Sequence, residues 1–345
     1  MAADEEIRPL TGLRGVAALW VFAFHFEKVL LLPFLFPGNY GRLGVELFFV
    51  LSGYVLCQRY LSAGRGPFLY RPFVARRFAR LYPAYLATHA LMGAVFAWAL
   101  AMGAPDGYGS HLSPWGAVAN LLMIQAWGTV PVLAWNAVAW SVSAEWVAYL
   151  ALFPFVVWAM GRPQARWILL GAFLATAAIL LAYALDLCNG YLIFDRTGGL
   201  RVLPTFLLGA LVWTWRGELQ GLAADLVALA AFAVIAWSLH SGKPVDVLLL
   251  PFFGAVVLGV AGQGPLLGRL LGHPWAVGLG RISYSFYLTH MAVLIFWGAV
   301  RFLTHWRMGA TAQALLCLGV QLPLAYACWR WVEEPGRRWL GARLA

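Results

Sequence analysis

Residues 166–186 read RWILLGAFLATAAILLAYALD. Between the arginine that begins this run and the aspartate that ends it there is no charged side chain. A helix needs about 20 apolar residues to cross the hydrocarbon core of a bilayer, which is about 30 Å thick, so the run predicts a transmembrane helix. Similar runs recur, and we expect membrane-spanning helices over residues 12–32, 42–60, 81–103, 138–160, 166–186, 198–215, 222–240, 244–262, 276–300 and 310–332.

The composition of the whole chain agrees with this interpretation. Of its 345 residues, 62% are apolar and 11% are charged, and the mean hydropathy is +0.76. Soluble domains contain about 45–50% apolar and about 25% charged residues. We therefore expect an all-α integral membrane protein in which residues 1–345 form a single transmembrane domain, a bundle of about ten helices surrounded by lipid.

The formal net charge of +10 comes almost entirely from arginine. In a soluble protein this excess would favour nucleic acid as a partner. Here the arginines lie in short connectors between apolar runs, and positive charge is enriched in the cytoplasmic loops of membrane proteins. The connector between the second and third runs is the most basic, so we place it in the cytoplasm together with both termini. We expect no binding to nucleic acid.

The apolar stretch at residues 115–132 is not included among the predicted membrane-spanning helices. If it crossed the membrane, every later basic connector, such as the one with Arg162 and Arg166, would face outward. Because arginine is enriched on the cytoplasmic side, we predict that this stretch is re-entrant or lies at the outer interface.

Arg14 and His25 are charged or ionisable residues inside the first predicted helix, where such groups are costly. They are eleven residues apart, about three helical turns, so they project from nearly the same face, roughly 16 Å apart along the axis. A neutral imidazole in the membrane is suited to act as a general base. The alternative is that the histidine packs between helices and the arginine extends to the headgroups.

Two glutamates also lie near predicted helix ends. Glu145, in WSVSAEW (140–146), could orient His25 or stabilise its charged form, or it could pair with a structural arginine. Glu46, in GVELFFVLSGY, could be a structural partner of Arg14 or Arg42 and could line a pocket in the bundle.

The basic connector contains the best candidate for an anion site. Arg77 and Arg80 are three residues apart and therefore neighbours on one helix face, with Arg76 beside them. Guanidinium groups bind phosphate in a bidentate manner. The phosphates of coenzyme A and the headgroups of anionic lipids both fit this chemistry.

Another cluster of polar residues lies at the start of the ninth predicted helix, in GRISYSFYLTH (280–290). Polar residues at helical spacing here are candidates for lining the interior of the bundle, or for hydrogen bonding between helices. They are Arg281, Tyr284, Tyr287 and His290.

Several common catalytic motifs are missing from the sequence. It has no phosphate-binding GxxxxGK[ST] loop, no GxSxG nucleophile elbow, no HExxH metal site and no CxxC pair. We expect no bound metal and no permanently bound cofactor.

Five stretches in this order closely resemble the acyltransferase-3 family of bacterial membrane O-acyltransferases. The resemblance extends from about Ile7 to Arg338, and five motifs in sequence are far more specific than one. The stretches are TGLRGVAALWVFAFHF (11–26), GVELFFVLSGYVL (44–56), RRFARLYPAYL (76–86), WSVSAEW (140–146) and GRISYSFYLTH (280–290).

The resemblance implies a ten-helix membrane domain that takes an acyl group, expected to be acetyl, from acyl-CoA. The acceptor would be a hydroxyl, often on a carbohydrate or glycolipid, and the location the inner (plasma) membrane. The family's arginine–histidine motif falls on Arg14 and His25. Its RxxR element, associated with the donor, falls on Arg77 and Arg80. Its glutamate falls on Glu145.

The sequence therefore predicts an acyl-CoA-dependent O-acyltransferase in which His25 is the general base and Glu145 holds its imidazole. Two alternatives stay open. A transporter or flippase of a lipid-linked saccharide would also have many helices with polar groups inside the bundle. A second possibility is O-acylation of a small hydroxylated metabolite.

Overall fold

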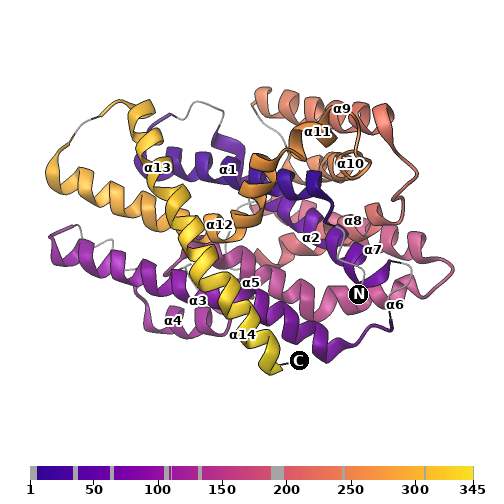
Figure 1. Cartoon of the computed structure of the whole chain (residues 1–345), viewed down its shortest axis with the longest axis horizontal. Coiled ribbons are helices and arrows are strands. Elements are labelled where there is room, and N and C mark those ends of the chain that lie inside the picture. Colours follow the sequence, from indigo (N-terminus) through magenta and orange to yellow (C-terminus); the bar gives the residue numbers. More distant parts are fainter. Residues whose placement is uncertain are drawn as a thin grey trace.

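The computed structural model describes residues 6–33, 38–62, 66–104, 109, 111–130, 134–187, 198–242, 245–306 and 308–344, and within these ranges it contains helices and turns but no strand (Figure 1). The α-helices are α1 (Arg8–Leu30), α2 (Gly44–Leu61), α3 (Tyr70–Ala101), α4 (Pro114–Leu121), α5 (Trp140–Val147), α6 (Phe153–Met160), α7 (Ala165–Leu187), α8 (Gly198–Trp213), α9 (Gly221–His240), α10 (Leu250–Ala261), α11 (Leu267–Leu271), α12 (Pro274–Thr304), α13 (Ala310–Cys328) and α14 (Glu334–Leu344).

The helices confirm the predicted membrane architecture. Among the described residues, 8 helical units are long and apolar enough to cross a bilayer. Two further apolar units are shorter, Gly198–Trp213 and Asp246–Ala261. Each of these units corresponds to one of the predicted spans, so the protein is an all-α integral membrane protein.

The stretch at 115–132 contains one short helix rather than a span. Helix α4 has 8 residues, a length of about 12 Å, and turns follow it. The described part of the stretch therefore does not cross a bilayer, as predicted; residues 131–133 lie outside the described ranges. Asn120 holds α4 against α3, because its backbone carbonyl accepts from the Tyr85 hydroxyl at 2.8 Å and its side-chain amide is hydrogen-bonded to His89 Nε2 at 2.7 Å.

Helix α3 begins at Tyr70, well before the predicted start at residue 81. Pro72 is in the first turn, where proline is favourable because its missing N–H has no partner there in any helix. The basic connector is therefore largely helical, and the 32 residues of α3 extend about 48 Å. This continuous helix fixes the directions in which Arg77 and Arg80 project.

Glycines allow two pairs of helices to approach closely. A Cβ atom added to Gly209 of α8 would lie 2.0 Å from the Val50 carbonyl oxygen of α2, and one added to Gly53 of α2 would lie 2.2 Å from the Phe206 carbonyl oxygen. Helices α1 and α12 pack in the same way, because a Cβ atom on Gly280 would lie 1.8 Å from the backbone of α1. Small residues of this kind are typical of helix contacts in membranes.

Two π-helical turns interrupt the helices beside the interior of the bundle. One, η4 (Ala148–Leu152), joins α5 to α6, and the other, η6 (Trp329–Glu333), joins α13 to α14. Such turns occur frequently at functional sites. They carry Tyr149 and Glu333, which both take part in the polar contacts described below.

Candidate active site

A narrow cavity of about 100 Å³ lies between α1, α2, α3, α5 and α12. We call it the polar cavity because charged and hydroxyl groups make up much of its wall. Its volume is enough for several water molecules. A larger ligand therefore enters only if side chains of the wall move apart. The polar lining residues are Arg14, Ser52, Arg77, Arg80, Ser141, Glu145, Tyr149, Ser283, Tyr284 and Tyr287.

The structure brings together three of the arginines that the sequence singled out, Arg14, Arg77 and Arg80. Arg80 forms an ion pair with Glu333. Arg77 donates to the Tyr60 hydroxyl at 3.3 Å, and its buried Nε has no partner among the described residues. Arg14 forms no hydrogen bond or ion pair with the part of the chain that the structure describes. The cavity thus has two guanidinium groups that form no ion pair with a described carboxylate, which makes it suited to an anion.

Glu145 lines the same cavity but contacts different residues from those expected. Its Oε1 accepts hydrogen bonds from Ser52 Oγ at 2.7 Å and from the Tyr149 hydroxyl at 2.6 Å. His25 is hydrogen-bonded elsewhere. The interpretation that Glu145 holds the His25 imidazole is therefore wrong for this structure, because α5 directs the carboxylate toward α2 and the π-helical turn.

His25 and His290 form a hydrogen-bonded pair whose proton positions follow from their partners. His290 Nδ1 lies 2.5 Å from the carbonyl oxygen of Tyr287, which can only accept, so this nitrogen carries a hydrogen. In a neutral ring, His290 Nε2 then accepts from His25 Nδ1, 3.0 Å away. His25 Nδ1 is also 3.0 Å from the Val21 carbonyl oxygen. The lone pair of the half-buried His25 ring is therefore on Nε2.

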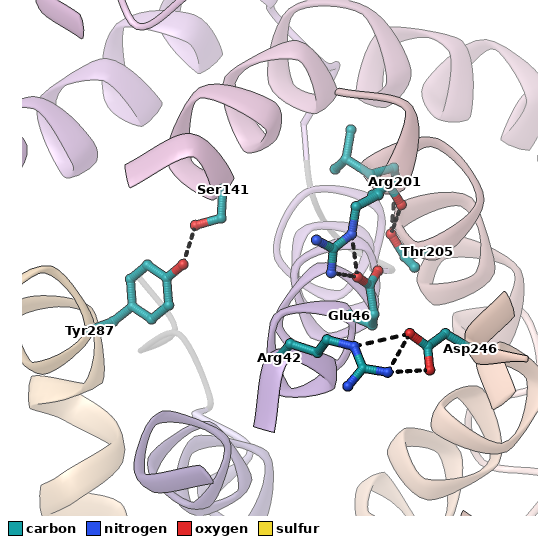
Figure 2. A network of polar contacts seen from close by, with 8 residues as sticks. Arg42, Glu46, Ser141, Arg201, Thr205, Asp246 and Tyr287 are labelled. Carbon is teal, nitrogen blue, oxygen red and sulfur yellow. Dashed lines mark hydrogen bonds and ion pairs between the residues drawn. The ribbon is translucent and has the colours of Figure 1, made fainter. Parts of the chain in front are cut away.

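The histidine pair lies beside one end of the polar cavity. His25 is not among the described lining residues, but Tyr287 is. The ring centroids of Tyr287 and His290 are 5.7 Å apart. The Tyr287 hydroxyl is held by a 2.8 Å hydrogen bond from Ser141 (Figure 2). Tyr287 thus connects the wall of the cavity to the histidine pair.

Glu46 does not line the polar cavity and is buried in an ion pair. Its carboxylate binds Arg201, whose Nε is 2.8 Å away and whose guanidinium lies 4.5 Å from the centre of the Trp140 ring. Arg42 binds Asp246 instead, with a shortest distance of 2.8 Å. Figure 2 shows the two pairs side by side. The proposed pairing of Glu46 with Arg14 or Arg42 is therefore wrong. The Arg201 side chain of α8 binds the Glu46 carboxylate of α2 instead.

Two further predicted site residues lie at the surface. Arg281 is in the second turn of α12 and binds Glu6 at 2.8 Å, and this cation holds the pKa of the Glu6 carboxyl below its usual range. Arg281 is therefore not part of the interior lining predicted for it, whereas Tyr284 and Tyr287 are. Arg76 is exposed and its Nε lies 3.4 Å from the Tyr60 hydroxyl.

Sequence reasoning missed Glu333 and Arg201. Glu333 was placed just beyond the last predicted span, although it follows an apolar helix and binds both Arg80 and Ser285, the latter at 2.6 Å. Arg201 lies inside a predicted span, and a charge in that position is costly without a partner. That cost was the signal that could have identified it.

The comparisons with known proteins agree with the membrane architecture. The family described as Acyltransferase domain (Acyl_transf_3) matches residues 8–330. A protein of Komagataeibacter xylinus named as a membrane-bound transacylase, BcsY, is 33% identical over 82% of this chain and 72% of its own length. The acyltransferase MdmB of Streptomyces mycarofaciens is 28% identical over 97% of this chain and 92% of its own length.

A third relative, protein 2 in the picA locus of Rhizobium radiobacter, is 32% identical over 51% of this chain. No solved structure matches the chain. The family match covers almost every described helix, including all those that line the polar cavity. The chain therefore belongs to the acyltransferase-3 family and is a multi-pass membrane acyltransferase.

Proposed function

We propose that this protein transfers an acyl group from acyl-CoA to a hydroxyl group of a carbohydrate or glycolipid, in the inner (plasma) membrane of a bacterium. The observation that carries the proposal is the polar cavity, with Arg14 and Arg77 at one end and Tyr287 beside the His25–His290 pair at the other. A donor with phosphates and a long arm fits such an arrangement. The arginine end is the end predicted to face the cytoplasm, where acyl-CoA is made.

The chemistry follows from the tautomer of the histidine pair. His25 Nε2 takes the proton of the acceptor hydroxyl as its oxygen attacks the thioester carbonyl carbon. The bond from carbon to sulfur then breaks, and the imidazolium returns the proton to the departing CoA thiolate. His25 is thus neutral again at the end of the cycle. The narrow cavity requires the pantetheine arm to displace water and separate the side chains of the wall.

The direct test is thiol release from acetyl-CoA by the purified protein in phosphatidylcholine vesicles, with a panel of oligosaccharide and small-molecule acceptors. We expect release that depends on an acceptor, and NMR of the product shows which hydroxyl carries the acyl group. Acceptor-dependent release with small hydroxylated metabolites alone would identify the second class of substrate. Movement of a lipid-linked saccharide across the vesicle without thiol release would contradict acyl transfer and indicate a flippase.

His290 is expected to act as a positioning residue for His25. Replacing it with alanine removes one of the two acceptors of His25 Nδ1–H and leaves only the Val21 carbonyl oxygen. A hydrogen bond to a charged group contributes about 1.5–3 kcal/mol, or about 10- to 100-fold in rate. We expect kcat to fall by this factor while KM for acetyl-CoA stays unchanged. In His290→Gln the amide oxygen replaces the acceptor, and we expect most of kcat to return. Equal losses in both variants would contradict this role.

A further inference from the structure

A second pocket opens at the surface where α2 ends and α3 begins. It has a volume of about 330 Å³, within the range of small-molecule sites, about 300–1,000 Å³. Two exposed arginines, Arg59 and Arg76, contribute to its wall, together with the rings of Tyr60 and Phe68. We call it the surface pocket.

Tyr60 lines the surface pocket and contacts two neighbouring arginines of α3. Its hydroxyl lies 3.4 Å from Arg76 Nε and 3.3 Å from Arg77 Nη2. The same ring has the guanidinium carbon of Arg76 at 5.7 Å and that of Arg77 at 5.6 Å from its centroid. Arg76 lines the surface pocket and Arg77 lines the polar cavity. The two spaces are therefore separated by Tyr60 and its two arginine contacts, a short distance for an extended ligand to bridge.

The chemistry of the surface pocket favours a phosphorylated nucleotide. Arginines at its wall can bind phosphate oxygens in a bidentate manner. The rings of Tyr60 and Phe68 both line the pocket and are nearly perpendicular, with centroids 6.3 Å apart. The pocket therefore also has an aromatic surface for a planar base. A lipid headgroup would use the arginines but would leave this aromatic surface without a function.

We propose that the surface pocket binds the phosphoadenosine part of the donor, while Tyr60 and Arg77 direct its pantetheine arm into the polar cavity. This inference rests on the proposed function, because it assumes that the donor is acyl-CoA. It assigns the nucleotide end to Arg59, Tyr60, Phe68 and Arg76, and it gives Arg76 a role separate from that of Arg77.

The test measures binding and needs no acceptor. The full-length protein in phosphatidylcholine nanodiscs is titrated with CoA, with 3′-dephospho-CoA and with adenosine 3′,5′-bisphosphate. In Arg59→Ala/Arg76→Ala we expect Kd for CoA to rise about 10- to 100-fold. We also expect the bisphosphate to compete with CoA in the original protein and to lose this ability in the double variant.

The matched control is Arg71→Ala, which removes an exposed charge from the same helix outside the pocket. We expect Kd for CoA to stay within about twofold, since screened surface charges contribute little. An unchanged Kd in the double variant, or an equal rise in Arg71→Ala, would overturn the inference. In parallel nanodiscs that also contain phosphatidylglycerol, loss of bound phosphatidylglycerol in the double variant without a change in CoA binding would overturn it as well. If the original protein neither binds CoA nor releases thiol, it is the proposed function that fails.

Discussion

His25→Ala protein is expected to transfer acyl groups about 10²–10⁴-fold more slowly than the original protein. This is the contribution of a positioned general base, and Nε2 of His25 is the nitrogen of the pair whose lone pair is available. Thiol release and NMR of the acylated product, at matched amounts of protein in the membrane, measure the loss.

The same variant should bind the donor normally, because His25 is not among the described lining residues of the polar cavity. A suitable control is His273→Ala, which removes an exposed histidine just before α12 and should leave the rate unchanged. Full activity in His25→Ala would rule out the proposed chemistry. A loss that comes entirely from a raised Kd for CoA would instead place His25 in the donor site.

Arg201→Met is expected to destabilise the protein by about 3–5 kcal/mol, because removing one partner of a buried ion pair leaves the other charge without compensation. The Arg201 side chain is 2% exposed and that of Glu46 is 0% exposed. The neighbouring Arg42 cannot replace the lost cation, since Asp246 already binds it. Unfolding in mixed micelles, followed by denaturant titration, measures the difference.

The double variant Glu46→Leu/Arg201→Met distinguishes loss of charge balance from loss of packing. Apolar residues of similar size can replace a buried ion pair with little cost or even a gain, so we expect most of the stability to return. Arg216→Met removes an exposed arginine just after α8 and should have little effect. A double variant as unstable as Arg201→Met would show that the shape of the arginine, stacked on Trp140, matters more than its charge.

The helices could be predicted from the sequence because a chain that crosses a lipid bilayer can adopt few backbone structures. A backbone in a bilayer must satisfy its own hydrogen bonds, so apolar runs of sufficient length become helices. The start of α3 was misplaced because Arg71–Arg80 looks like a connector when only hydropathy is considered. Pro72 was the better signal, since proline is common in the first turn of a helix.

The candidate site could be predicted only where its residues share a helix. The spacing of Arg77 and Arg80 was enough to place both on one face, and both line the polar cavity. The partner of His25 was missed because His290 is on α12, and nothing in the sequence states that α1 and α12 pack together. Contacts between helices depend on close approach at positions such as Gly280, which a single sequence does not reveal.

The buried ion pairs have a consequence for how the chain is made. Glu46 precedes its partner by 155 residues, and Arg42 precedes its partner by 204. At about 5–20 residues per second, a ribosome needs roughly 8–30 s to synthesise the shorter of these intervals. The first helices of the nascent chain therefore reach the membrane with unmatched charges. They depend on the insertion machinery or on the bilayer surface until α8 supplies Arg201 and the turn before α10 supplies Asp246. The buried ion pairs therefore form only late in synthesis. Chains truncated before α8 should be targets for quality control.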